Sequence, residues 1–434
     1  MNKDMKRYIL NIMLAAAVAL GFSSCNDYPD AFVQTDGVPT VHGIRYADQD
    51  VLIEQAFMGE IICLMGDNLR SIHELYFNDQ QALLNTSYMT ENTLVVAVPG
   101  TIPTDRTDKM YMITAAQDTV TYDFKVMMPS PTIKSINCEY QPVGTEAVII
   151  GDFFTEPLTL EFANATVTEF KSISKTELRF IIPETALPGK VKVTTESGTA
   201  QSPFMYLDNR GLITDFDGPG NAGSTHGVVP QGWNIKASYS DVDGISGSYV
   251  QLGPSTLGAD GAWNEELKLP FWCGNWNGDP MSITSGAGVP ICNIVDFTDW
   301  KNMAIKFELC IPAENPWSAG AMQVVFASAE RCANDSWQNN TYIHTSADGG
   351  YDLCRGFYRP WEASGSFDTA GKWITVTIPF ADFTYNADGT PGKTPLSGPE
   401  DFASLIIWPW SGGLNGAECT PVFRIDNIRA VPVK

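Results

Sequence analysis

The first 232 residues of this 434-residue chain contain no tryptophan, and all eleven tryptophans lie between Trp233 and Trp410. Tryptophan is large and stiff, with a flat face that stacks on ligands and an N–H that needs a partner. The asymmetry therefore divides the chain into a tryptophan-free half and an aromatic half. The question is whether these eleven rings form a core or face a ligand.

Metal-binding and catalytic side chains are also scarce. Only four histidines are present, no Cys-x-x-Cys pair occurs, and no histidine stands at zinc-ligand spacing. This pattern argues against a zinc site and leaves little material for histidine-based catalysis.

Positive charge is the third shortage, with 27 Lys and Arg against 50 Asp and Glu and a net charge of −23. No basic stripe is available to meet a phosphate backbone, which argues against nucleic-acid binding. An acidic surface favours solubility and does not repel a neutral ligand. The hydrophobic fraction of 44% and the charged fraction of 18% are typical of a globular protein.

The N-terminus has the anatomy of a signal peptide over residues 1–24. Lys3, Lys6 and Arg7 precede an apolar run from Tyr8 to Phe22, and Ser-Ser-Cys25 follows. The pattern resembles a bacterial lipoprotein signal, with Phe22 in place of the usual leucine. It predicts a lipid on Cys25 after cleavage, and an ordinary secreted protein that is cut nearby is the alternative.

Residues 25–38 are predicted to be a flexible linker from that cysteine. The acidic stretch Asn-Asp-Tyr-Pro-Asp directly after Cys25 resembles the surface-export signal of Bacteroidota lipoproteins. We therefore expect an outer-membrane protein that is lipid-anchored and faces the cell exterior. The other eight cysteines allow disulfides in an exported chain, but their pairing is open, and single buried thiols are an equally good interpretation.

Two copies of one pattern fill residues 39–128 and 129–208. Each opens with Pro-Thr and an apolar strand, continues with a Gly-Asp turn (Gly66-Asp67, Gly151-Asp152), and closes on an apolar strand before a proline. Short Val- and Ile-rich strands broken by Gly, Pro and Asn predict antiparallel sandwiches. This repeated residue pattern resembles that of the IPT/TIG family of immunoglobulin-like domains. We expect the Gly to supply a positive φ and the two sandwiches to form a stiff spacer.

Residues 209–434 are predicted to be one larger β-sandwich of jelly-roll type, with long Gly- and Asn-rich loops. Helical periodicity is scarce, so the whole chain is predicted to be all-β. The strand candidates are Met303–Ile311, Ala321–Ala327, Trp373–Pro379, Leu405–Trp408 and Val422–Ile428.

The tryptophans do not all have the same expected role. Trp373 lies in a regular alternating strand and Trp300 directly precedes one, so both are assigned to the structure. An aromatic ring beside Asn, Gln, Asp and Arg can stack on a pyranose while the polar groups bond its hydroxyls. The residues that meet this criterion, and that we predict to bind a glycan, are Trp276, Trp317, Trp337, Tyr358 and Trp361.

A lipid anchor, IPT-like repeats and a terminal aromatic sandwich together resemble the surface glycan-binding proteins of Bacteroidota polysaccharide-utilisation systems. The C-terminal motifs that carry the resemblance are Asn-Pro-Trp317-Ser-Ala-Gly, Tyr358-Arg-Pro-Trp361 and Gly-Lys-Trp373-Ile-Thr-Val-Thr-Ile-Pro. The resemblance implies a non-catalytic protein that binds a β-glucan such as xyloglucan or mixed-linkage glucan. It also implies a SusD-like protein, a TonB-dependent transporter and a surface glycosidase as partners.

Two other functions remain open from the residues. A glycosidase or lyase needs two suitably spaced carboxylates, and the available ones are Glu265, Glu266, Glu308, Glu330 and Glu362. Glu265 and Glu266, as neighbours in a strand, would point to opposite faces. An adhesin that binds protein through exposed aromatic residues is the third function.

No cofactor is expected, apart from a structural calcium ion of the kind that many carbohydrate-binding sandwiches carry. Asp215, Asp217 and Asp426 supply oxygen donors near the two ends of the C-terminal domain.

Overall fold

The computed structural model describes residues 32–218, 230, 235–262, 264–273, 289–329 and 353–433. Over these residues the regular structure is β-strand with short 3₁₀ turns, which confirms the all-β prediction. None of the described helices is long and apolar enough to cross a membrane. The described 3₁₀ turns are Leu69–Ser71, Thr86–Tyr88, Glu265–Leu267, Ile291–Asn293, Trp300–Asn302, Pro360–Glu362, Phe380–Asp382 and Pro399–Phe402.

The first sandwich packs two antiparallel sheets around its own core, which includes Ile44, Leu64 and Phe77. One sheet has the order β1 (Thr40–Tyr46), β3 (Ile61–Asp67), β6 (Thr93–Ala97). The other has the order β5 (Gln80–Gln81), β4 (Ile72–Phe77), β7 (Lys109–Thr114), β8 (Thr119–Asp123). A parallel pair, β2 (Gln55–Phe57) with β9 (Lys125–Met127), completes it.

The second sandwich repeats this plan around a core that includes Ile149, Phe162 and Phe180. One sheet has the order β10 (Thr132–Ile136), β11 (Glu146–Asp152), β15 (Glu177–Ile181), β14 (Phe170–Ile173). The other has the order β13 (Ala165–Thr166), β12 (Leu158–Phe162), β16 (Gly189–Thr195), β17 (Gly198–Tyr206). The predicted tandem of immunoglobulin-like sandwiches is confirmed.

The repeated glycines have a different role from the one predicted. Neither Gly66 nor Gly151 has a positive φ. A Cβ on Gly66 would lie 1.8 Å from the carbonyl oxygen of Thr40, and one on Gly151 would lie 1.9 Å from that of Thr132. Both contacts fall beside an irregularity in the pairing with the preceding strand. Glycine is required because two backbones approach too closely for a side chain.

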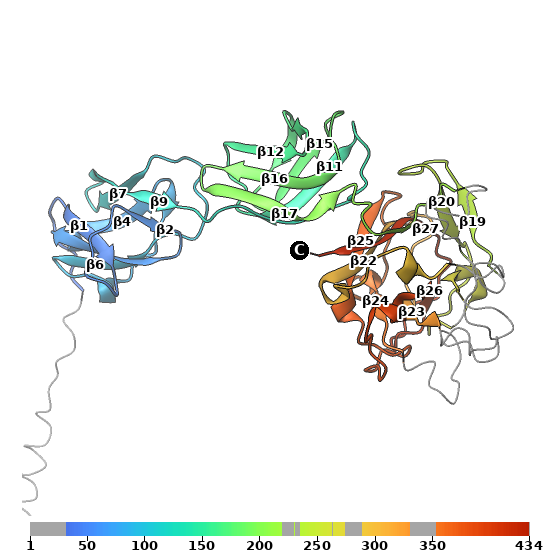
Figure 1. Cartoon of the computed structure of the whole chain (residues 1–434). Coiled ribbons are helices and arrows are strands. Elements are labelled where there is room, and N and C mark those ends of the chain that lie inside the picture. Colours follow the sequence, from blue (N-terminus) through green and yellow to red (C-terminus); the bar gives the residue numbers. More distant parts are fainter. Residues whose placement is uncertain are drawn as a thin grey trace, which may run out of the picture. The chain divides into compact units, whose positions relative to one another are not determined.

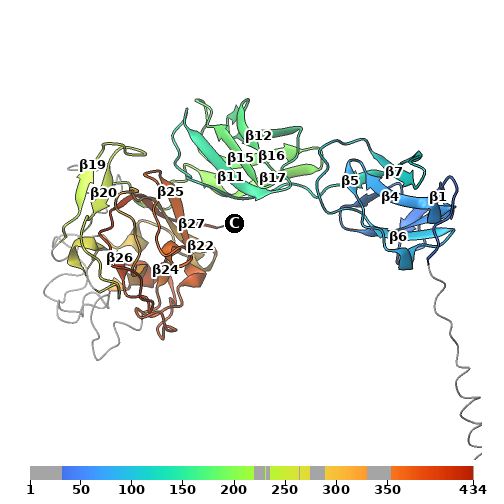
Figure 2. The same ribbon diagram turned by 180° about the vertical axis from the view of Figure 1, so that it is seen from behind.

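The strands of the C-terminal sandwich form two sheets (Figures 1 and 2). A large apolar core lies between them. The first has the order β19 (Ser238–Ser240), β20 (Tyr249–Leu252), β27 (Phe423–Pro432), β22 (Met303–Cys310), β25 (Ile374–Pro379), and β18 (Leu212–Thr214) also pairs with β27. The second has the order β21 (Leu269–Phe271), β26 (Ser404–Trp410), β23 (Ala321–Ala327), β24 (Gly356–Tyr358). The predicted larger jelly-roll-like sandwich is confirmed.

The chain forms two compact units, residues 1–129 and residues 130–434. The predicted boundary between residues 208 and 209 therefore lies inside a compact unit, because the second and the C-terminal sandwich pack together. Cys63, Cys138 and Cys310 are single buried thiols, in line with one of the two interpretations left open for the cysteines.

Candidate functional site

The sheet formed by β21, β26, β23 and β24 is apolar on both faces. Met322, Val324 and Phe326 of β23 point into the core, as alternation in a strand requires. The intervening Val325 and Ala327 are also buried, on the opposite face. An antiparallel sheet commonly has one face in water, but here the second face, which we call the outer face, is apolar and buried as well. Its buried cluster comprises Trp272, Cys273, Val325, Ala327, Leu353, Ala403, Ile406 and Trp408.

Two tryptophans of β26 lie on the outer face. Trp408 is opposite Gln323 of β23, and Trp410 is opposite Ala321. Their ring centroids are 5.8 Å apart, with the planes tilted by 42°. Trp408 is buried and Trp410 is half-buried, so Trp410 is the more accessible of the two.

A second aromatic pair lies at the β24 edge of the outer face. Phe357 is opposite Gln323 in the sheet, so its ring is on the outer face. Tyr385 stacks on it with the ring centroids 4.8 Å apart and the planes 13° from parallel. The backbone of Tyr385 pairs with Arg355 as an isolated bridge, which widens the sheet by one position. Tyr385 is 42% exposed and presents an aromatic surface to solvent.

Buried polar side chains connect these two aromatic pairs. The Gln323 amide donates to the carbonyl oxygens of Ala387 (2.8 Å) and Trp410 (2.6 Å). Arg355 Nη1 donates to Gln323 Oε1 at 3.0 Å. Gln323 and Arg355 are fully buried. Buried amides in a low-dielectric interior hold their partners firmly, so Gln323 fixes the loop after Tyr385 and the end of β26 to one strand.

The two loops at this edge also touch each other directly. Arg359 Nη1 donates to the carbonyl oxygen of Gly412 at 2.6 Å, and Gly412 N donates to the carbonyl oxygen of Ala387. Gly413 has a φ of +78°, and a Cβ there would lie 2.2 Å from the carbonyl oxygen of Asp388. Thr390 holds the pKa of the exposed Asp388 carboxyl below its usual value through its hydroxyl and its N–H. The edge therefore combines aromatic rings with planar and charged polar groups.

Trp317 and Trp361, which the sequence predicts to bind a glycan, belong to the core. Trp317 has no exposed surface, and its Nε1 donates to the carbonyl oxygen of Ala319 at 2.5 Å. Trp361 is 4% exposed and donates to the carbonyl oxygen of Gly320 at 2.7 Å. Neither ring has a free face for a sugar, so the prediction for these two is wrong. Their polar neighbours had indicated a subsite, but the indole N–H groups bond to backbone carbonyls instead.

The other predicted residues have different outcomes. Tyr358 is opposite Met322, so it is on the core side of the sheet, where it is half-buried against Trp317 and Phe367. Burial raises the pKa of Tyr358 to about 12. Trp276 and Trp337 lie outside the described residues, as do Trp233 and Trp263.

Residues of the outer face that the prediction missed carried a usable signal. Trp410 stands beside Ser-Gly-Gly, and Tyr385 is followed by Asn-Ala-Asp-Gly. Turn-forming residues follow both rings, although only Tyr385 has the Asn and Asp neighbours that the criterion above requires. Phe357 gave no such signal, because only the pairing of β23 with β24 places it on this face.

The carboxylates considered for catalysis are dispersed or blocked. Glu308 is fully buried, and Arg429 binds both of its oxygens. Glu265 and Glu266 lie in a 3₁₀ turn and not in the strand expected from the sequence. Glu362 pairs with Arg359 at 2.9 Å, and Glu330 lies outside the described residues.

The three aspartates considered for calcium do not form a metal-binding group. No cluster of three or more His, Cys, Asp or Glu side chains suited to a metal occurs in the described parts of the chain. Asp217 accepts from Ser248 N, and Asp426 accepts from Ser246 Oγ and Asn427 N. Each of these two carboxylates thus has protein partners of its own, and a structural calcium ion stays a prediction.

Comparison with known proteins gives one family and several relatives. The model of the surface glycan-binding protein B xyloglucan-binding domain matches residues 206–432. The crystal structure of surface glycan-binding protein PbSGBP-B from Prevotella bryantii is 38% identical, with a TM-score of 0.78, and the match covers 92% of this chain and 100% of that one. SGBP-B from a complex xyloglucan utilization locus in Bacteroides uniformis is 16% identical, with a TM-score of 0.42, over 91% of this chain and 100% of that one.

A Bacteroides ovatus protein described as IPT/TIG domain-containing is 25% identical over 162 residues. This match covers 35% of this chain and 32% of the relative, so it spans about a third of that protein's length.

Proposed function

Because the chain belongs to the surface glycan-binding protein B family, we propose that its C-terminal sandwich binds a β-glucan on the aromatic outer face. The family places the protein at the cell surface as a glycan-binding protein. Xyloglucan is the first candidate ligand, because the matching family model describes a xyloglucan-binding domain. Mixed-linkage glucan is the second.

The observation that carries this proposal is the pair of aromatic surfaces on one sheet. The rings of Trp410 and of Phe357 with Tyr385 are held by strands and buried amides, so little order is lost when a ligand arrives. The equatorial hydroxyls of a β-glucan leave its pyranose faces apolar, and such faces pack on aromatic rings. A neutral chain is indifferent to the protein's charge of −23.

Polar groups next to the rings can orient the bound glycan chain. The Arg359 guanidinium and the Asp388 carboxylate lie on loops that meet at the β24 edge. Planar groups that donate or accept two hydrogen bonds match the vicinal hydroxyls of a sugar. We propose that these side chains set the direction of the glycan while the rings supply most of the contact area.

We further propose that the protein is non-catalytic and anchored through a lipid on Cys25. In this account it holds polysaccharide beside a SusD-like protein, a TonB-dependent transporter and a surface glycosidase. The fully buried Glu308 supports binding without hydrolysis, since a catalytic carboxylate has to reach the glycosidic bond.

The test is affinity electrophoresis of residues 26–434, the chain without its signal peptide and the predicted lipidated Cys25, through gels that contain single polysaccharides. We expect retardation by xyloglucan or mixed-linkage glucan and none by a starch gel. A reducing-sugar assay on the retaining polysaccharide should stay at background. A folded protein that no glycan retards would refute binding, and released reducing ends would refute the non-catalytic assignment.

A further inference from the structure

Charged residues occupy the middle of strands in the sheet that contains β22, β25 and β27. Lys306 and Glu308 of β22 and Arg429 of β27 are 5%, 0% and 0% exposed. In an isolated sandwich these side chains would point into water from the face opposite the core. Unpaired ions are rarely buried, because loss of hydration is costly. Another part of the chain must therefore cover this face of the sheet and supply groups of opposite charge.

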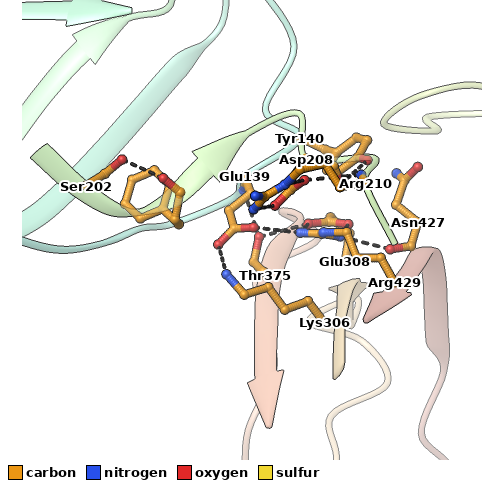
Figure 3. A network of polar contacts seen from close by, with 11 residues as sticks. Glu139, Tyr140, Ser202, Asp208, Arg210, Lys306, Glu308, Thr375, Asn427 and Arg429 are labelled. Carbon is orange, nitrogen blue, oxygen red and sulfur yellow. Dashed lines mark hydrogen bonds and ion pairs between the residues drawn. The ribbon is translucent and has the colours of Figure 1, made fainter. Parts of the chain in front are cut away.

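The covering surface is the second sandwich, and its Glu139 enters the network directly (Figure 3). Glu139 Oε1 lies 2.5 Å from Lys306 Nζ, and Glu139 Oε2 lies 2.8 Å from Arg429 Nη2. Glu139 follows β10 and is itself 4% exposed. One carboxylate of the second sandwich thus bridges two cations of the C-terminal sheet.

The charges of the network balance only when Glu139 is included. Arg429 binds Glu308 through Nη1 (2.7 Å) and Nη2 (3.0 Å), which leaves Lys306 as the second cation. Burial alone would lower the pKa of Arg429, but the carboxylates of Glu308 and Glu139 raise it. Two carboxylates and two cations are neutral together. Without Glu139, one positive charge would remain in a buried site.

Hydrogen bonds of Thr375 cross the same interface. Glu139 N donates to Thr375 Oγ1 at 2.7 Å, and Thr375 Oγ1 donates to Glu308 Oε1 at 2.9 Å. Thr375 N donates to the carbonyl oxygen of Asn137 at 2.9 Å. Backbone and side chain of β25 are therefore both bonded to the segment that carries Glu139.

An apolar cluster seals the network. Cys138, Tyr140 and Ile245 are buried together, with Leu207 and Trp373 packed against them. The Arg429 guanidinium lies 4.7 Å from the centroid of the Tyr140 ring, a cation–π contact. These residues come from both sandwiches and from the connection between them, so the joint is packed like a domain interior.

We propose that the second sandwich is an integral part of the glycan-binding module, coupled to it through the docking of Glu139 onto Lys306 and Arg429. Residues 130–434 then move and unfold as one body, and the connection around Leu207 is no hinge. The spacer role predicted for both sandwiches remains for the first one alone.

Calorimetry of residues 26–434, the chain without its signal peptide and Cys25, tests this directly. Unfolding enthalpy scales with residue number. We therefore expect two transitions, and the one of residues 130–434 has roughly three times the enthalpy of the other. A third transition, with the second sandwich melting alone, would overturn the proposal.

Substitutions identify the coupling residue. Glu139→Gln keeps the shape of the side chain but leaves a buried cation without its counter-charge. It should lower the melting temperature of the large transition by roughly 5–10 °C or split that transition in two. Glu177→Gln, which breaks the more exposed pair with Arg179 in the same sandwich, is the matched control and should shift it by about 1 °C or less. The transition of the first sandwich serves as an internal reference.

The double variant Glu139→Gln with Lys306→Met restores neutrality, because only Arg429 and Glu308 remain. It should melt above Glu139→Gln, and it keeps the test decisive if the single variant does not fold. The proposal would be overturned if the two substitutions lowered the melting temperature additively in the double variant. It would also be overturned if Glu139→Gln lowered the melting temperature no more than the Glu177→Gln control does.

Discussion

Asp426 provides a quantitative test of how the C-terminal sheet handles buried charge. Its carboxyl has no exposed surface, and burial raises its pKa to about 9, a shift to which nearby Glu308 and Asp217 add. The folded protein therefore holds a proton on Asp426 between about pH 4 and pH 9, where the unfolded chain does not. Because the folded state binds the extra proton, the contribution of Asp426 to stability falls as pH rises through this window.

The replacement Asp426→Asn removes this dependence while keeping the size of the side chain. Each pH unit inside the window is worth about 1.4 kcal/mol. Between pH 5 and pH 8 the stability of the variant relative to the wild type should therefore improve by about 4 kcal/mol. The assay is urea unfolding of the large transition at both pH values, with EDTA present so that no cation neutralises the carboxylate.

The control is Asp296→Asn, because Asp296 is exposed and its hydrogen bonds with Thr298 lower its pKa. This variant should gain no stability at the higher pH. A stability difference between Asp426→Asn and the wild type that is the same at pH 5 and pH 8 would show that Asp426 is ionised in the folded protein. That result would refute the reasoning.

Three further predictions concern packing and loop position. Trp317→Ala should lower the free energy of unfolding of residues 130–434 by about 3–5 kcal/mol in chemical denaturation, because a buried ring is lost. A change below about 1 kcal/mol would contradict the burial of Trp317. Gly66→Ala should destabilise the first sandwich by about 3 kcal/mol because its Cβ meets the Thr40 carbonyl, whereas Gly100→Ala, with open space around it, should not. Arg359→Met should weaken glycan binding several-fold in a titration by freeing the Gly412 loop, whereas Glu362→Gln should leave it unchanged; equal effects would contradict a role for that loop.

The sequence predicts the fold well because its signals are local. Short Val- and Ile-rich strands between turn residues gave three sandwiches, and four of the five proposed C-terminal strands match β22, β23, β25 and β26 closely. The fifth, Val422–Ile428, is the first part of β27, which continues to Pro432. The end of a strand depends on its partner, here β22, which no local pattern reveals.

The site was harder to predict because the burial of a side chain depends on segments that are distant in the sequence. Trp317 and Trp361 stand among polar and turn residues, yet both rings pack inward and bond to the backbone near Gly320. Lys306, Glu308 and Arg429 alternate in strands as solvent-facing charges would, and only the docked second sandwich explains their burial. Position along the chain was informative in one respect: the aromatic surface does lie in the tryptophan-rich half.

Isothermal titration of residues 26–434 with xyloglucan tests the central claim most directly. Trp410→Ala and Tyr385→Ala should each weaken binding about tenfold, the effect of losing about 1.4 kcal/mol of contact. Tyr88→Ala, which removes a 60% exposed ring from the first sandwich, should bind like the wild type. Wild-type affinity in both Trp410→Ala and Tyr385→Ala, with the fold intact, would show that the glycan does not bind on the outer face.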